Sequence, residues 1–338
     1  MFVNFKKIIF TLVFFLMFYV FYQIIVIRSQ YVRNQEDKVE NENNNKEPFE
    51  SRPYLESSKV LDLPLKEYVI MSSWNSAVDY DGIVSLEVLE KVVQRGYRLL
   101  DMEIYLTENE PHVGFSSEKS FDTVESVPVS FLDVCDMLLA KAFFVSNKLD
   151  PLLLHLRIKS RNTDIYDKIA NILKMKFNER LYTKQITGET TLAELQNKVV
   201  IIVDRNYAPH LKDYECKSCS VNLNKQVAVY SGTPTFQSLR TYEKLDKPYT
   251  PLEVVENGRT NVEKWQMVSN GIGDFYTEEN KPDFYNFVLS HSVQIIPHKV
   301  ASKDEALQIY EMFFQNNGKR AFVPMAVAHD YIEFEAGG

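Results

Sequence analysis

Residues 66–81 read KEYVIMSSWNSAVDYD, and the fold prediction starts from this stretch. The run at 68–71 has the aromatic and β-branched composition of a buried strand, and small polar residues follow it. Trp74 comes next, where we expect the chain to turn toward solvent. A buried strand that ends in polar residues and a tryptophan is typical of the rim of an α/β site.

Downstream of this stretch, strand-like and helical patterns alternate. Apolar runs predict strands at 97–106, 112–115, 151–159, 199–204, 226–231, 292–298 and 320–327. Helical spacing predicts helices at 85–94, 130–142, 164–176, 191–196 and 303–316. Continuous apolar runs separated by helices indicate parallel strands, and their spread over about 270 residues fits a (β/α)8 TIM-type barrel. A doubly wound α/β sheet is the alternative.

Composition supports a folded domain with a sizeable core. The chain has 338 residues, of which 45% are hydrophobic and 13% aromatic, so it is not disordered overall. Its formal net charge is -8, and basic residues form no dominant cluster. We therefore expect no nucleic-acid partner.

The N-terminal region differs from the rest. Residues 8–27 (IIFTLVFFLMFYVFYQIIVI) carry no charge, and at about 1.5 Å per residue a helix of this length spans a bilayer core. A cleaved signal peptide, which has a shorter apolar core, is the alternative. We expect a short tail at 1–7, a transmembrane anchor at 8–27, a flexible polar stalk at 28–58 and a folded domain at 59–338. Basic residues flank both ends of the anchor, so the sequence does not decide on which side of the membrane the folded domain lies.

Three cysteines give little indication of function. Cys216 and Cys219 form a CxxC pattern, but a zinc site needs a second ligand pair, and the sequence offers none at a suitable spacing. We expect an exposed loop with two thiols or a small local disulfide. Cys135 falls in an apolar helical pattern and is predicted to be a core residue.

In a TIM-type barrel the functional residues follow the carboxyl ends of the strands. The predicted strand ends carry Trp74, Asn75, Asp101, Glu103, Phe115, His155, Arg157, Asp204 and His298. Asp101 and Glu103 are two residues apart on one strand and share a face. With the amide of Asn75 they would suit a hard cation such as calcium. The alternative is that these carboxylates pair with Arg157 or face water.

The motifs at these strand ends resemble the X half of the phosphoinositide-specific phospholipase C family. Residues 72–75 (SSWN) correspond to the family's Ser-Ser-His-Asn, and 96–103 (GYRLLDME) to its Gly-Cys-Arg-Cys-x-Glu-Leu-Asp. Residues 111–116 (PHVGFS) correspond to Pro-x-x-Tyr-His-Gly. The resemblance covers an X-like half at about 59–205 and, less specifically, a Y-like half at about 226–335. It implies the barrel of the phospholipase C-like phosphodiesterases.

The same resemblance argues against catalysis. The family's two catalytic histidines, a general base and a general acid, fall on Trp74 and Phe115, and neither side chain can transfer the required protons. We expect these two rings to face each other as an apolar floor or to plug the barrel. His112 and His155 are the candidate replacements, although strand alternation predicts that His112 faces away from Phe115.

The implied calcium site is also incomplete. Asn75, Asp101 and Glu103 match three of the family's four calcium ligands, whereas the fourth position holds Arg157. A permanently positive guanidinium at that position could pair with both acids and replace the charge of the metal. We therefore expect no cofactor, or calcium if the protein is active. The sequence indicates no substrate-binding residue.

These expectations favour a membrane-anchored phospholipase C-like barrel without catalytic activity, which binds a lipid headgroup, a membrane surface or a protein. The first alternative is a divergent calcium-dependent phosphoric diester hydrolase that acts on phosphoinositides. The second is a tethered structural protein whose barrel is only a spacer.

Overall fold

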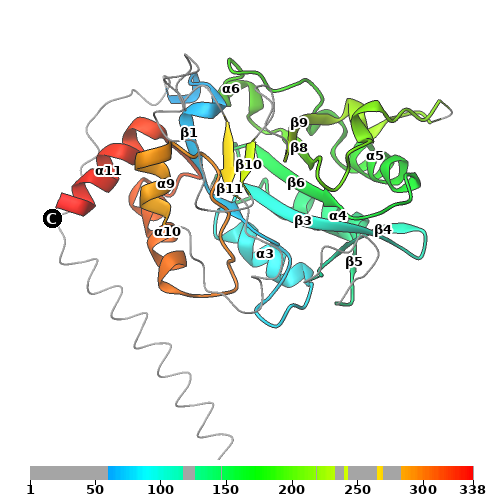
Figure 1. The fold of residues 1–338 in the computed structure, drawn as a ribbon, viewed down its shortest axis with the longest axis horizontal. Coiled ribbons are helices and arrows are strands. Elements are labelled where there is room, and N and C mark those ends of the chain that lie inside the picture. Colours follow the sequence, from blue (N-terminus) through cyan, green and yellow to red (C-terminus); the bar gives the residue numbers. More distant parts are fainter. Residues whose placement is uncertain are drawn as a thin grey trace, which may run out of the picture. The chain divides into compact units, whose positions relative to one another are not determined.

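The computed structural model describes residues 60–116, 126–145, 147–217, 219–232, 240–242, 265–268 and 283–337 (Figure 1). The chain divides into Met1–Glu50 and Ser51–Gly338, and every described residue belongs to the second unit. The expected tail at 1–7, anchor at 8–27 and stalk at 28–58 lie outside the described residues. Within the described part of the chain, no helix combines the length and the hydropathy needed to cross a bilayer.

Four parallel strands form the centre of the main sheet. They are adjacent in the order β3 (Leu99–Thr107), β6 (Leu152–Ile158), β8 (Val199–Asp204) and β9 (Val227–Ser231). The two-residue strands β2 (Ser72–Ser73) and β7 (Leu181–Tyr182) run parallel beside β3 and β8. Every residue of β6 and β8 is buried, as expected for strands covered on both faces.

Other strands pair antiparallel, which corrects the expectation of parallel strands only. β4 (Glu110–Gly114) folds back on β3, and β5 (Val129–Ser130) pairs with β4. Glu108 and Asn109 both have positive φ, of 51° and 63°, the combination that a tight two-residue hairpin turn requires. So short a turn can join only antiparallel strands. β1 (Tyr68–Ile70) also pairs antiparallel, with β12 (Phe322–Pro324).

Helices follow most of the strands. They are α3 (Leu86–Gln94), α4 (Phe131–Lys141), α5 (Asp164–Phe177), α6 (Leu192–Leu195), α9 (Phe284–His291), α10 (Glu305–Asn316) and α11 (Met325–Gly337). Short 3-10 helices lie at Leu65–Glu67, Asn178–Arg180, Leu211–Asp213 and Leu223–Lys225. Figure 1 shows α9, α10 and α11 grouped near β1, and α4 and α5 near β4.

The α/β fold is as predicted, but strand pairing among the described residues does not close a barrel. β10 (Arg240–Tyr242) and β11 (Gln266–Val268) pair with each other, and no pairing between described residues joins them to β9. The predicted strand at 292–298 forms only isolated bridges, from Ile295 to Ile70 and Met267, and from His298 to Ser73. The predicted strand at 320–327 ends at Pro324, because proline has no N–H for a ladder, and α11 follows at once.

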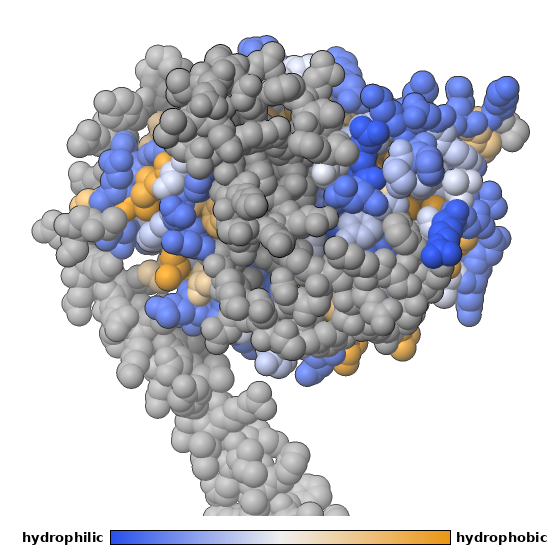
Figure 2. All heavy atoms as spheres, viewed as in Figure 1, coloured by the Kyte–Doolittle hydropathy of each residue, from blue (hydrophilic) through white to orange (hydrophobic). Residues whose placement is uncertain are grey.

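On the face that Figure 2 shows, hydrophilic side chains predominate among the described residues, and hydrophobic ones form small separate areas. The exposed large hydrophobic residues are Tyr80, Ile83, Val127, Phe144, Leu149, Met175, Ile309 and Phe334. Isolated apolar side chains of this kind are normal on a protein surface. Cys135 is buried in α4 as predicted, and Cys216 and Cys219 form a disulfide, one of the two expected alternatives.

Candidate functional site

The candidate site lies where β3 and β6 run side by side. The strand register pairs Asp101 with His155 and Glu103 with Arg157, so these side chains share one face of the sheet. Asn75 follows β2 with φ of 44°, and its backbone N–H donates to Asp101 Oδ1 at 3.1 Å. All five residues are buried, with at most 4% of their surface exposed.

Arg157 occupies the centre of this group. Its Nε donates to Asp101 Oδ2 at 3.0 Å, and its Nη2 donates to Asp101 Oδ1 at 2.6 Å. Nη1 donates to Glu103 Oε1 at 2.6 Å, and Nη2 also donates to Asn75 Oδ1. The guanidinium therefore lies among the three side chains that the sequence indicated as calcium ligands, and it uses their oxygen atoms as its own acceptors.

Trp74 covers the guanidinium. The centre of its ring lies 3.9 Å from Arg157 Cζ, which is a cation–π contact in a desolvated setting. Trp74 is 5% exposed and Phe115 is 2% exposed. The expectation that Trp74 sits where the chain turns to solvent is therefore wrong. The attraction between the ring and the buried charge explains why this tryptophan points inward.

Lys159 supplies a second buried cation that the sequence analysis missed. Its Nζ lies 2.9 Å from Glu103 Oε1, and it also lies over the rings of Tyr105 and Tyr207 at 5.7 Å and 5.5 Å. The hydroxyl of Tyr105 donates to Glu103 Oε2 at 2.6 Å. A signal was available, because Lys159 is two residues beyond Arg157 and so continues the same face of the chain.

The charges of this network balance without a metal. The carboxylates of Asp101 and Glu103 face the cations of Arg157 and Lys159. Burial alone would raise the pKa of Asp101, but the attraction of Arg157 and the hydrogen bond from His155 lower it to about 2. Burial alone would lower the pKa of Arg157, and the two carboxylates raise it above its usual value instead.

These residues do not fit a calcium ion. Calcium takes six to eight oxygen ligands, and here the oxygens of Asn75, Asp101 and Glu103 already accept hydrogen bonds from Arg157. A dication at the same place would be repelled by two fixed positive charges. No step of a reaction is therefore derived through calcium.

His155 belongs to the same network. Its Nδ1 donates to Asp101 Oδ2 at 2.6 Å, and its Nε2 lies 2.7 Å from Ser231 Oγ at the end of β9. A carboxylate, an imidazole and a serine in this order resemble a general-base array. All three are 0% exposed and Asp101 is shared with Arg157, so the array braces β3, β6 and β9 in the core. Ser231 was not predicted as a site residue.

The remaining predicted residues lie elsewhere or have other roles. His112 pairs with Tyr105 in the β3–β4 ladder, so it lies on the same hairpin face as Tyr105, and its Nδ1 bonds to the carbonyl of Glu110 at 2.9 Å. His298 is fully buried and stacks on Tyr310 with ring centres 3.9 Å apart. Burial lowers the pKa of His298 to about 4. Burial also raises the pKa of Asp204, at the end of β8.

Comparison with known families gives this arrangement a context. Residues 61–205, which hold β2, β3, β6 and β8, match the family described as phosphatidylinositol-specific phospholipase C, X domain. Residues 61–205 are thus a region of the phospholipase C X-domain type, similar to the phospholipase C-like phosphodiesterases. The family resemblance inferred from residues 72–75, 96–103 and 111–116 is thereby confirmed. Curated proteins gave no sequence match.

Two solved structures with TM-scores of 0.60 show a similar fold. The L. pealei PLC21 structure has a TM-score of 0.60 and 17% identity, with 78% of this chain and 37% of that chain covered. The S. officinalis PLC21 structure gives the same values, 0.60, 17%, 78% and 37%. A calcium-dependent phosphoinositol-specific phospholipase C from Pseudomonas sp. has a TM-score of 0.48 and 9% identity over 81% of this chain and 99% of that one. This phospholipase C-like chain thus spans 37% of the length of the two PLC21 proteins.

Proposed function

We propose that this phospholipase C-like protein has no phosphodiesterase activity and acts by binding. The observation that carries the proposal is the place of Arg157, whose guanidinium bonds to Asn75, Asp101 and Glu103. By resemblance, these three residues correspond to calcium ligands of the family. A cation built into the chain would therefore stand in for the metal.

The aromatic residues support the same proposal. Trp74 and Phe115 stand at the positions that correspond to the family's catalytic histidines, and both are buried. An indole N–H can only donate a hydrogen bond, and a phenyl ring has no group that donates or accepts a proton. His155 is the histidine nearest to the acids, and both of its ring nitrogens are already engaged in the core. General acid–base chemistry at phosphorus would thus lack its two proton-transferring groups.

We further propose that the apolar segment 8–27 tethers the protein to a membrane and that its ligand is a lipid headgroup, the membrane surface or a protein. A tether raises the effective concentration of the domain next to the bilayer, which favours weak binding there. The direct assay is co-sedimentation of the full-length protein, reconstituted in nanodiscs, with vesicles that contain phosphatidylinositol or phosphatidylcholine only.

The test of the inactive site combines metal binding and turnover. We expect the thermal unfolding of the full-length protein to be the same in calcium and in EDTA, with no hydrolysis of phosphatidylinositol. A ligand that binds the native state at a hundred times its Kd would stabilise it by about 2.7 kcal/mol, which is easily detected. Calcium-dependent stabilisation together with turnover would overturn the proposal in favour of a divergent calcium-dependent phosphodiesterase.

The Arg157→Glu variant sharpens this test. It would place a fourth oxygen ligand beside Asn75, Asp101 and Glu103, so we expect calcium to raise its unfolding temperature where wild type does not respond. Arg157→Gln is the matched control, because it removes the guanidinium without adding a carboxylate. Equal calcium responses of the two variants would contradict the role given to this position, and the wild-type measurement stands even if a variant fails to fold.

A further inference from the structure

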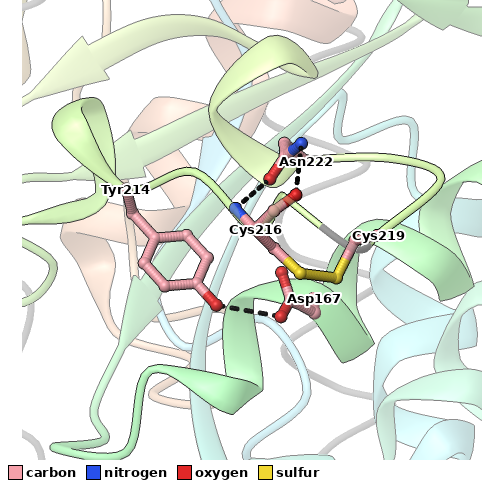
Figure 3. The surroundings of a disulfide bond; sticks show 5 residues. All are labelled: Asp167, Tyr214, Cys216, Cys219 and Asn222. Atoms are coloured by element: carbon pink, nitrogen blue, oxygen red, sulfur yellow. Dashed lines mark hydrogen bonds between the residues drawn. A yellow bond between two sulfur atoms is a disulfide. The ribbon is translucent and has the colours of Figure 1, made fainter.

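The Cys216–Cys219 disulfide lies beside the half-buried carboxylate of Asp167. It belongs to the segment between β8 and β9, and Asp167 reaches it from α5 (Figure 3). The ligand atoms of Asp167, Cys216 and Cys219 all lie within 4.8 Å of one another. Thiolate sulfur and carboxylate oxygen are both ordinary ligands of zinc.

Asp167 has one oxygen that the described protein leaves unused. Its Oδ2 accepts a hydrogen bond from the hydroxyl of Tyr214 at 2.9 Å. Its Oδ1 is buried and has no hydrogen-bond partner within the described part of the chain. Buried polar atoms in folded proteins nearly always have a hydrogen-bond partner, so this oxygen atom is a candidate to coordinate a ligand.

The loop is held in place by contacts that do not involve sulfur. Asn222 Oδ1 accepts from the backbone N–H of Cys216 at 2.7 Å, and Asn224 Nδ2 donates to the carbonyl of Tyr214 at 2.7 Å. The ring of Tyr214 packs edge-on against Tyr166 of α5, with ring centres 5.2 Å apart. The backbone N–H of Cys219 donates to the carbonyl of Cys216 at 3.4 Å, so opening the disulfide would leave both cysteines close to Asp167.

We propose that the reduced form of this loop binds one Zn²⁺ through the thiolates of Cys216 and Cys219 and the free carboxylate oxygen of Asp167, with water as the fourth ligand. A zinc–sulfur distance of about 2.3 Å in tetrahedral geometry places the two sulfurs roughly 3.7 Å apart, which the CxxC spacing accommodates. A zinc site was not expected from the sequence, because no second ligand pair lies at a suitable spacing along the chain, but the fold supplies a third ligand from α5.

The charge balance couples this site to redox state. A phosphine breaks the disulfide by taking an oxygen atom from water, so phosphorus is oxidised and two thiols form; a thiol reductant does the same by disulfide exchange. Zinc binding then releases both thiol protons to solvent. Two thiolates and one carboxylate carry three negative charges in a half-buried place, and the dication reduces the net charge there to -1. In the oxidised form the sulfurs carry no charge, so this loop offers zinc only the carboxylate of Asp167.

The experiment uses the full-length protein, either oxidised or reduced with a phosphine under inert gas. Each sample is equilibrated with Zn²⁺, desalted and analysed for bound metal. We expect one zinc per reduced chain and none per oxidised chain. Co²⁺ in place of zinc should give thiolate-to-cobalt charge-transfer absorption in the reduced wild type, and this readout needs no variant to fold.

Variants separate the proposed site from other thiols. Cys216→Ser with Cys219→Ser should abolish binding while Cys135 remains, and Asp167→Asn should weaken zinc binding by about tenfold or more. Asp164→Asn, an exposed carboxylate on the same helix, is the matched control and should bind as wild type does. Absence of zinc and of the cobalt absorption in reduced wild type, or unchanged affinity in Asp167→Asn, would overturn the proposal.

Discussion

At the scale of single residues, Arg157 combines three properties that no metal ion has together. It carries a permanent charge, it donates in a fixed planar geometry to Asp101, Glu103 and Asn75, and its flat face accepts the ring of Trp74. A bound cation would supply the charge but neither the directional N–H bonds nor the stacking surface. The tryptophan and the arginine therefore form one structural unit.

Loss of this guanidinium should strongly destabilise the protein. Arg157→Met would leave Asp101 and Glu103 buried with one cation fewer, and removing one partner of a buried ion pair costs about 3–5 kcal/mol. Arg157→Lys should lose less free energy of unfolding than Arg157→Met. Lysine keeps the positive charge, although it cannot form the several directed hydrogen bonds of the guanidinium. Urea unfolding of both variants measures the difference. A loss of under about 1 kcal/mol in Arg157→Met would contradict a buried ion network.

Residue types alone predicted only part of this network. Asp101 and Glu103 had to share a face because they are two residues apart on a strand, and Arg157 was recognised as a cation at a metal position. Ser231 was missed because its contact with His155 depends on β8 lying between β6 and β9. Such neighbour relations between strands distant in sequence are set by packing of the whole sheet and have no local signal.

At the scale of elements, five helices and most strands were predicted close to their positions, whereas α9 and α11 were missed and strand direction was predicted less well. Helix α3 was expected at 85–94 and runs over Leu86–Gln94, because its apolar spacing and its capping serine are local features. Strand direction is not local. The β3–β4 hairpin depends on positive φ at Glu108, a residue type that gives no turn signal in the sequence.

The N-cap of α3 offers a direct test at this scale. The side chain of Ser85 accepts a hydrogen bond from the backbone N–H of Glu87 at 3.1 Å. Ser85→Ala should lower the free energy of unfolding by about 1 kcal/mol, because that N–H loses its acceptor in the helix. Ser85→Asp should retain stability, since aspartate caps equally well. Thermal unfolding of the two variants side by side checks this, and equal losses would exclude a capping role.

At the scale of the whole molecule, the α/β class was predicted correctly, but strand pairing among the described residues does not close the predicted barrel. Isolated bridges join β1 and β2 to the segment at 295–298. Among the described residues, β9 and β10 do not pair with each other. The sequence pattern in 292–298 is apolar, but a left-handed Ser292 and the missing N–H of Pro297 limit it to bridges. Strand propensity does not reveal such interruptions.

Two groups should each make the native state less stable as the pH falls, in different pH ranges. Burial lowers the pKa of His298 to about 4 from 6.5, so between those pH values the unfolded chain binds a proton that the native state does not, and stability falls. For Asp101, lowered from 3.8 to about 2, the stabilisation is complete above pH 3.8 and is lost as the pH falls toward 2. Asp150, whose pKa burial raises to about 6, acts in the opposite direction.

A histidine variant isolates the contribution of His298. As the pH falls from 6.5 to 4, His298→Gln should lose less free energy of unfolding than wild type, with a difference on the order of 3 kcal/mol. His210→Gln, at an exposed position, is the matched control and should follow wild type. Urea unfolding at several pH values gives the slopes. Parallel curves for wild type and His298→Gln would show that another group governs this range.

The buried guanidinium has a consequence for how the protein is made. Because Arg157 is part of the chain, the cation at the centre of β3 and β6 arrives in fixed one-to-one proportion with the carboxylates that need it. Assembly of this core can begin during synthesis without waiting for an ion to diffuse in. The interaction is inherited with the gene, so a cell can remove it only by mutation and cannot adjust it from one moment to the next.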